Sequence, residues 1–276
     1  MAVSGKTNLL LVAPAAALLG LFFALPVAAL VVDAFAAGGS AFARVFALQT
    51  FWPSVAGSLL LTAVASCVSI AVGAPVALFL SRLPEQRRTA LAFLIALPLT
   101  FSGLIVAYGF ILAYGRAGFF TQLAGFAGGD MAVIGRWLFT PVGLAFASSY
   151  YLIPRVVMLL LPVLVNFDHQ QLAVAESLGA TRLGALREVL LPQVAGPIVS
   201  AFCLIAAVVF GAYGTALALV GTQLRILPLQ LYSLVSETGT DFPAAAALAL
   251  VITATCSAIM AMGEWVSHGR ERHLAA

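Results

Sequence analysis

The chain has 276 residues, of which 63% are hydrophobic and only 8% are charged. A soluble domain has about 25% charged residues, so this composition excludes a water-soluble globular protein and indicates that lipid is the main solvent. The formal net charge is only +3, and no nucleic-acid partner is expected.

Six stretches are long and apolar enough to cross a hydrocarbon core of about 30 Å, which takes about 20 helical residues. In chain order they are Leu9–Val32, Val55–Leu80, Ala90–Tyr114, Leu138–Val165, Gln193–Val220 and Pro243–Met262. Their apolar residues are continuous rather than alternating, which predicts helices and excludes the strands of a membrane barrel. The first stretch is too long for a typical cleavable signal sequence. We therefore expect an all-α integral membrane protein with six transmembrane helices and a single domain, residues 1–276, embedded in the lipid bilayer.

Lysine and arginine are shared unevenly between the two sides of this arrangement. With the N-terminus inside, eight of them face the cytoplasm and four face outside, which is the asymmetry that the positive-inside rule describes. The short loop 81–89 contributes Arg82, Arg87 and Arg88. The sequence thus predicts that both termini and the loop 166–191 lie in the cytoplasm.

Several function classes lack the residues that they need. Lys6 is the only lysine, so the chain has no P-loop of the form G-x-x-x-x-G-K-[ST] and cannot bind ATP in that way. No predicted span contains Asp or Glu, which ion-coupled carriers usually need at membrane depth. The three cysteines lie in apolar runs without metal-ligand spacing. We expect no metal site, no catalytic residue and no enzymatic activity.

Arg155 is the one charged residue inside a predicted span. A charge at membrane depth marks a substrate or gate contact by default. The alternative is a side chain that binds helix-end carbonyls or extends toward the cytoplasmic interface. Its distance from Asn166, about 16 Å along a helix, is long for the latter.

The cytoplasmic loop begins with a pattern typical of a short amphipathic helix. Leu172, Ala175 and Leu178 recur every three residues, which predicts that they share one helix face. Gly179 then follows, and glycine accepts the left-handed conformation that ends many helices.

A second short helix is expected directly after this glycine. Thr181 can cap it, its leucines Leu183, Leu186 and Leu190 would share one face, and Pro192 would open the next span. The two helices predict an elbow with one apolar face against the spans and one polar face in water. Such an elbow is either a docking surface for a soluble partner or a simple connector at the interface.

The spacing of this loop resembles the EAA loop of permease subunits of binding-protein-dependent ABC importers, E-A-A-x-x-x-G-x(9)-I-x-L-P. Gly179, Val189, Leu191 and Pro192 fall on the glycine, isoleucine, leucine and proline of that motif, and Ala175 falls on its second alanine. The flanking S-L-G-A-T also resembles the family's usual S-L-G-A-S.

The chain departs from the motif at its first two positions. Ala173 stands where the family has glutamate, and Val174 stands at the first alanine. Any ion pair made by that glutamate must be absent or replaced, and Glu176 is the candidate replacement. The resemblance implies an ATPase-coupling loop made of Leu172, Ala173, Ala175, Glu176, Leu178, Gly179, Ala180, Thr181, Leu183, Val189, Leu191 and Pro192.

The resemblance also implies a fold and a set of partners. The expected fold is that of a type I ABC importer permease, with a five-helix core at about 55–263, an extra N-terminal helix at 9–32 and a coupling loop at 166–191. The partners would be an ABC ATPase dimer, an extracytoplasmic solute-binding protein and a second permease subunit, for which a heterodimer is favoured. ATP and magnesium would bind to the ATPase, so this chain is expected to bind no cofactor. The expected location is the bacterial inner membrane.

The segment 210–235 resembles permeases of the polyamine, 2-aminoethylphosphonate, thiamine and iron branch. A polyamine-like or aminophosphonate solute is favoured on that basis. The candidate pathway residues are Tyr108, Tyr114, Arg155, Gly211, Tyr213, Gly214 and Thr215. Helix packing by the small residues and interfacial anchoring by the aromatic ones are the alternative explanations. A self-contained secondary carrier and a non-transporting membrane scaffold remain the alternative functions.

Overall fold

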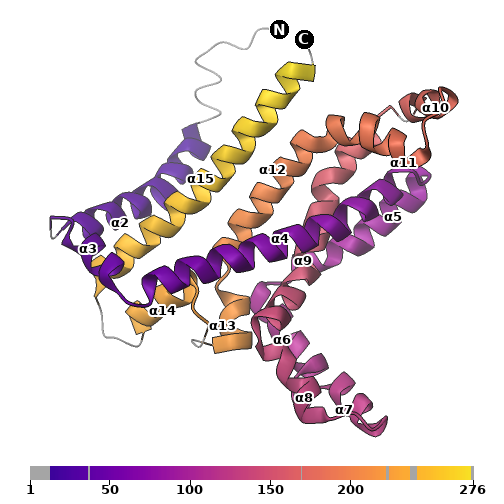
Figure 1. Cartoon of the computed structure of the whole chain (residues 1–276). Helices are drawn as coiled ribbons and strands as arrows, with labels where there is room; N and C mark the ends of the chain where they lie inside the picture. Colours follow the sequence, from indigo (N-terminus) through magenta and orange to yellow (C-terminus); the bar gives the residue numbers. More distant parts are fainter. Residues whose placement is uncertain (1–12, 37, 169, 222–223, 237–240, 275–276) are drawn as a thin grey trace.

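The computed structural model describes residues 13–36, 38–168, 170–221, 224–236 and 241–274, which are mostly helical and include no strand (Figure 1). Six of the described helices are long and apolar enough to cross a membrane. They are Ala13–Phe35, Phe51–Ser81, Gly103–Phe126, Pro141–Val165, Arg182–Phe210 and Phe242–Ser267. The expected all-α architecture with six membrane helices is confirmed, and residues 9–12 of the predicted first span lie outside the described residues.

The helices follow one another with short connections, and the first span includes the π turn η1 (Gly20–Ala24) and α2 (Leu25–Phe35). The remaining elements are α3 (Ser40–Ala47), α4 (Phe51–Ser81), α5 (Glu85–Ala96), η2 (Leu97–Thr100), α6 (Gly103–Tyr114), α7 (Phe119–Phe126), α8 (Met131–Arg136), η3 (Trp137–Phe139), α9 (Pro141–Val165), α10 (Gln170–Ser177), α11 (Arg182–Ala185), η4 (Leu186–Leu190), α12 (Leu191–Phe210), α13 (Gly214–Val220), α14 (Leu227–Ser236) and α15 (Phe242–Leu274).

Helix α4 packs against α9 and α12, α12 packs against α15, and α15 packs against α2. The buried face of α4 consists mainly of small residues at three- and four-residue spacing, among them Ser54, Ser58, Thr62, Ser66, Ser69, Gly73 and Ala77. Small residues let membrane helices approach closely where lipid offers no hydrophobic drive for association. At one such close approach, a Cβ on Gly73 would lie 2.7 Å from Cβ of Val156 on α9.

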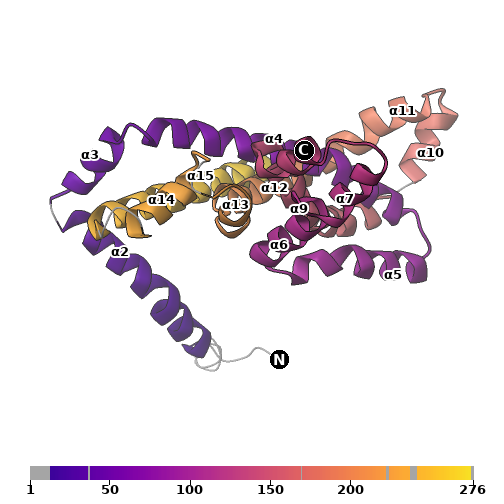
Figure 2. The same ribbon diagram turned by 90° about the horizontal axis from the view of Figure 1, so that it is seen from below.

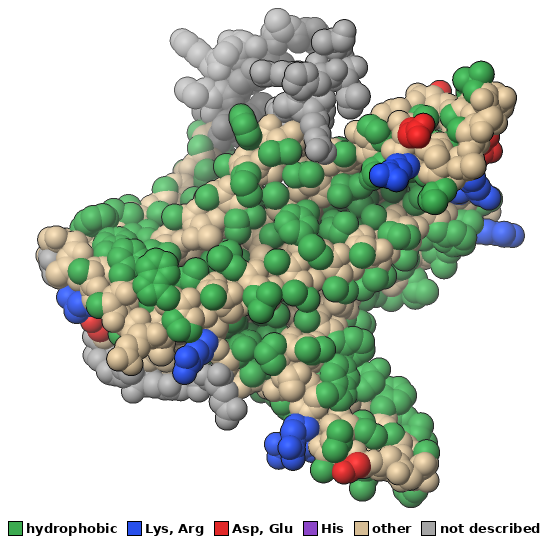
Figure 3. All heavy atoms as spheres, viewed as in Figure 1, with side chains coloured by type: hydrophobic (Ala, Val, Ile, Leu, Met, Phe, Trp, Pro, Cys, Tyr) green, Lys and Arg blue, Asp and Glu red, His purple; other side chains and the backbone are tan. Residues whose placement is uncertain are grey.

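The outer surface is apolar between charged ends. Figure 3 shows hydrophobic side chains over the middle of the viewed face and charged side chains gathered near its extremities. The observed first, fifth and sixth spans extend past one or both predicted ends and take in Asp33, Glu188 and Glu264. The prediction that no span contains an acid is therefore wrong at these ends, because the helices extend past the apolar stretches, but no acid lies in the middle of a described span.

The third predicted span, Ala90–Tyr114, is not one continuous helix. Helix α5 ends at Ala96, the 3₁₀ turn η2 follows, and Phe101 and Ser102 have extended backbone before α6 begins. Pro98 lies inside this turn and has no backbone N–H to continue the helix. Ser102 then caps α6, since its hydroxyl oxygen accepts a hydrogen bond from the Ile105 N–H at 3.4 Å.

The fifth predicted span, Gln193–Val220, is broken as well. Helix α12 ends at Phe210, residues 211–213 are not helical, and α13 begins at Gly214. Hydropathy does not detect such a break, because the residues on both sides of it are equally apolar. The breaks in the third and fifth spans meet at one place in the fold, where residues from both line the same pocket.

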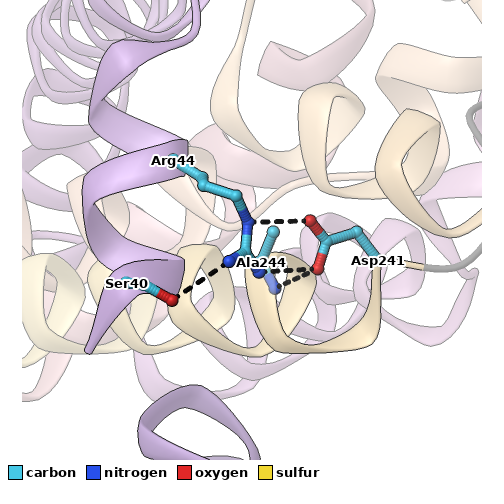
Figure 4. Close-up of polar contacts among 4 residues, drawn as sticks. All are labelled: Ser40, Arg44, Asp241 and Ala244. Carbon is cyan, nitrogen blue, oxygen red and sulfur yellow. Dashed lines mark hydrogen bonds and ion pairs between the residues drawn. The ribbon is translucent and has the colours of Figure 1, made fainter. Parts of the chain in front are cut away.

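One ion pair is found among the described residues, and it joins the start of α15 to α3 (Figure 4). The Arg44 guanidinium donates to both carboxylate oxygens of Asp241, from Nε to Oδ2 at 3.1 Å and from Nη2 to Oδ1 at 3.0 Å. The Ala244 N–H donates to the same Oδ1 at 3.1 Å. The hydrogen bonds from Arg44 and then from Ala244 hold the pKa of Asp241 below its usual value.

We expect Asp241→Asn to lower stability more at neutral pH than at low pH. A carboxyl with a depressed folded-state pKa contributes stability above its unfolded value, about 3.9, and loses it as the pH falls through the folded-state value. Both side chains are nearly half exposed, at 47% and 41%, so the loss should not exceed about 1 kcal/mol. Thermal unfolding of both proteins at pH 7 and pH 3 measures this, and an equal difference at both pH values would show that the charge is not responsible.

Candidate functional site

The loop 166–191 folds into two helical segments joined by a sharp corner. Helix α10 starts where the Asp168 carboxylate accepts a hydrogen bond from the Gln170 N–H at 3.0 Å. It ends at Ser177, and the turn that follows contains Gly179, whose φ is +96°. The Ala180 N–H donates to the Ala175 carbonyl at 3.1 Å and the Gly179 N–H to the Glu176 carbonyl at 3.0 Å, which is the bonding pattern of a Schellman motif. The prediction that Gly179 ends this helix is confirmed.

The second helix starts as predicted but does not stop. The Thr181 hydroxyl caps α11 by accepting a hydrogen bond from the Gly184 N–H at 3.1 Å. Helix α11 then runs through the π turn η4 directly into α12, so the expected separate short helix is wrong. Pro192 has no N–H for the Glu188 carbonyl, and the widened turn places the Leu191 N–H on the Leu186 carbonyl instead.

The two helices do not present the single apolar face that their leucines suggested. Leu172 is 9% exposed and Leu190 is 5% exposed, and both join the core formed with α4, α9 and α12. Leu178 is 83% exposed and Leu183 is 77% exposed. The corner at Gly179 carries these two leucines away from the other helices, toward the extremity where Figures 1 and 2 show α10 and α11. The whole projection, residues 170–190, is called the elbow.

A pocket of about 300 Å³ opens between the elbow and the end of α4. Its charged lining residues are Arg82, Glu176 and Arg182, and Ala173 lies beside them. The position where the importer motif has glutamate is therefore exposed and adjacent to a carboxylate one helical turn further on. Arg82 had not been predicted at this site, and only the structure shows that the end of α4 reaches it.

A hydrogen bond between two glutamine side chains connects the elbow to the membrane helix that follows. The Gln193 amide donates to the Gln171 carbonyl oxygen at 2.7 Å. Among the other predicted loop residues, Val189 packs against the core, Ala175 and Ala180 are half-buried, and Leu191 and Pro192 are exposed. The elbow is thus a preformed projection that is connected to α12 through both of its helical segments.

A second pocket, of about 350 Å³, lies where the two helix breaks meet. Four of the candidate pathway residues line it, namely Arg155, Tyr213, Gly214 and Thr215. Ser102 and Tyr151 line it as well and had not been predicted. We call this the break pocket, and its lining comes from α6, α9, α12, α13 and the turn before α6.

The other candidate pathway residues are not part of the break pocket. Gly211 lies at the end of α12 but is not among the lining residues. Tyr108 is 57% exposed on α6. Tyr114 is stacked on Phe120, with ring centroids 5.0 Å apart, and belongs to an aromatic cluster.

The comparisons with known proteins agree on one family. The profile of the family described as binding-protein-dependent transport system inner membrane component matches residues 69–272. The chain is 31% identical over 201 residues to the sulfate transport system permease protein CysT of Salmonella typhimurium, covering 71% of this chain and 69% of that protein. It is 26% identical over 203 residues to the spermidine/putrescine transport system permease protein PotB of Escherichia coli, covering 71% and 70%. Across the leading curated relatives, the chain spans from 64% to 88% of the relative's own length.

A solved structure of a bacterial alginate ABC transporter, in complex with an alginate-bound periplasmic protein, contains a chain with the same fold. Its TM-score is 0.74 at 17% sequence identity, over 95% of both chains. The family profile matches more than half of this sequence, and the fold agrees with it. The chain belongs to the family of inner membrane components of binding-protein-dependent transport systems.

Proposed function

We propose that this chain is a permease subunit that forms one half of a solute pathway and is driven by a separate ATPase. The observation that carries the proposal is the elbow, on which Leu178 and Leu183 are exposed at 83% and 77% beside a glycine-capped corner. Exposed leucines beside an exposed charged residue such as Arg182 are typical of a protein interface. Family membership supports the same interpretation.

The elbow has the mechanical properties that coupling requires. Its first helix is tied to α12 by the Gln171–Gln193 hydrogen bond, and its second helix continues into α12 without a break. A displacement of the elbow by a partner therefore moves α12, which ends at the break pocket. We propose that two such subunits alternate between inward-facing and outward-facing states as rigid bodies while ATP binds and is hydrolysed on the partner.

The remaining features of the assembly follow from this role. We propose a location in the bacterial inner membrane, both termini in the cytoplasm, an ATPase dimer that holds ATP and magnesium, a solute-binding protein outside, and a second, different permease subunit. Glu176 is the carboxylate that replaces the motif glutamate at Ala173, since both residues line the pocket beside Arg82 and Arg182. The solute predicted from resemblance is polyamine-like or an aminophosphonate.

A secondary carrier or a scaffold would use the elbow differently. A carrier needs no soluble motor and responds to an ion gradient, whereas a scaffold needs no pathway residues. Neither alternative explains why two leucines are exposed on a capped projection whose base is continuous with a broken span. The importer subunit is therefore the better supported function.

Photo-cross-linking at the elbow tests this function. We expect benzoylphenylalanine in place of Leu183 to cross-link in native membranes to a polypeptide that contains a P-loop. The same probe in place of Phe126, which is 90% exposed at the end of α7, is the matched control and should not capture it. Absence of an ATPase cross-link from Leu183, or an equal yield from both positions, would contradict the proposal.

A further inference from the structure

The break pocket contains a charge that the described part of the protein does not neutralise. Arg155 lies ten residues before Val165, the last residue of the 25-residue helix α9, which is about 15 Å of helix. Among the described residues, the guanidinium has neither a hydrogen-bond acceptor nor an ion-pair partner. A charge at such a depth is unfavourable unless water, a partner group or a ligand compensates it.

The other polar side chains of the pocket are hydroxyl groups, which can donate as well as accept hydrogen bonds. Its lining includes the hydroxyl groups of Ser102, Tyr151, Tyr213 and Thr215 and contains no Asp, Glu, Asn or Gln. Thr215 is only 3% exposed, and its hydroxyl makes no hydrogen bond within the described structure. This hydroxyl lies so close to Gly103, the first residue of α6, that a side chain there would collide with it.

The helix ends at this place do not by themselves select a sign of charge. The N-terminus of α6 would attract an anion, but the C-terminus of α12 lies at the same pocket and would attract a cation. The selection therefore depends on Arg155. A guanidinium with five donors in a fixed plane is suited to two oxygen atoms of a carboxylate, phosphate or related oxyanion.

We propose that the break pocket receives an oxyanion and that Arg155 is its principal contact, with the Thr215 hydroxyl as a second donor. This inference rests on the proposed pathway function and names the charge class of the solute. A tetrahedral oxyanion or a phosphonate fits the donor set, whereas a polyamine would place its ammonium groups against a guanidinium. Of the two solutes predicted from resemblance, the pocket is compatible with the aminophosphonate.

The electrostatic potential in the break pocket can be measured without knowing the solute. A cysteine is introduced as Tyr213→Cys, a position that is 38% exposed and lines the pocket, after Cys67, Cys203 and Cys256 are replaced by alanine. In membrane vesicles that contain the assembled transporter, its rate of modification is compared for an anionic sulfonatoethyl and a cationic trimethylammonioethyl methanethiosulfonate. The ratio of the two rates removes any effect of Arg155 on the ionisation of the thiol.

We expect the anionic-to-cationic rate ratio to fall at least about tenfold when Arg155→Gln is added, by the Coulomb energy of a nearby unit charge. Arg136→Gln, which removes an exposed arginine at the end of α8, is the matched control and should leave the ratio unchanged. Arg155→Lys keeps the charge and should keep the ratio. A ratio that does not change with Arg155→Gln would overturn the inference.

Protection experiments then identify the ligand class. Spermidine serves as the cationic comparison in this assay. Sulfate, molybdate, inorganic phosphate and 2-aminoethylphosphonate are each tested for slowing the modification of Tyr213→Cys, at ionic strength matched with chloride. At least one of them should protect by about tenfold or more in an Arg155-dependent way, as expected for charge-assisted hydrogen bonds, and the one that protects identifies the oxyanion. Protection by spermidine alone, or by none of the anions because a carboxylate of the second permease subunit already pairs with Arg155, would overturn the inference.

The proposed function and this inference can fail separately. The ATPase cross-link at Leu183 does not depend on the pocket, and the modification ratio at Tyr213→Cys does not depend on the elbow. A cross-link to an ATPase without Arg155-dependent protection would refute only the inference that the pocket binds an oxyanion. Arg155-dependent protection without a cross-link would refute only the proposal that an ATPase binds the elbow.

Discussion

Gly179→Asp should lower the ATPase activity that co-purifies with the chain by at least about tenfold. The amount of the chain in the membrane should stay unchanged. Gly179 has a φ of +96°, which an L-amino acid adopts at a cost of about 1–2 kcal/mol. A Cβ there meets no atom within 4 Å, so the substitution distorts only the corner. The expected result is a stable membrane protein whose Leu178 and Leu183 no longer hold the arrangement that we propose the ATPase binds.

Gly128→Asp is the matched control for this substitution. Gly128 also has a positive φ, +88°, and a Cβ added there would meet no atom within 4 Å, but it lies between α7 and α8. The same strain is therefore introduced far from the elbow. ATP hydrolysis that is retained in Gly179→Asp, or lost equally in both variants, would show that the corner is not specific for coupling.

Gly73→Ala should lower the stability of the helix bundle by about 1–3 kcal/mol, the usual effect of overpacking. The added Cβ would lie 2.7 Å from both Cβ and Cγ1 of Val156 and 3.2 Å from the Ile153 carbonyl oxygen. Val156 is fully buried at 0% exposure, so neither its branched side chain nor the backbone of α9 can move away freely. Helices α4 and α9 would have to separate at the centre of the core.

Gly109→Ala is the matched control for this packing effect. Gly109 lies inside α6, and no atom lies within 4 Å of an added Cβ. Alanine is the better helix former by about 1 kcal/mol, so this variant should be as stable as the parent or slightly more stable. The measurement is thermal unfolding of the three proteins in nanodiscs. Equal midpoints for Gly73→Ala and Gly109→Ala would contradict the tight α4–α9 contact.

The sequence was sufficient to predict the membrane architecture, because it depends on composition averaged over about 20 residues. It was insufficient for the third and fifth spans, where the backbone breaks at Pro98 and after Phe210. Hydropathy does not distinguish a continuous apolar helix from two apolar helices with a turn between them. Pro98 together with the capping residue Ser102 was the available signal for the first break. The Gly211–Gly214 segment was the corresponding signal for the second.

The elbow shows which local rules carried over to the structure. Gly179 and Thr181 affect only the backbone within about four residues along the chain. Their roles as helix stop and helix cap could therefore be predicted from residue type. Whether Leu178 and Leu183 are buried or exposed depends on whether another helix packs against them. The periodicity of the sequence does not contain that information. The position of Arg155 far from the ends of its helix, by contrast, could be predicted from the length of its span. Arg155 lines the same pocket as Tyr213 and Thr215 because the helix breaks in the third and fifth spans lie beside each other, which only the structure shows.

Co-purification tests most directly whether a separate ATPase binds the elbow. The full chain should be extracted from its native membrane in mild detergent, captured through a C-terminal tag, and the accompanying proteins identified by mass spectrometry. We expect an ATPase with a P-loop in stoichiometric amount, reduced at least about tenfold in Gly179→Asp and unchanged in Gly128→Asp. Recovery of the chain without any ATPase, in a form that transports solute along an ion gradient, would contradict this expectation and favour a secondary carrier.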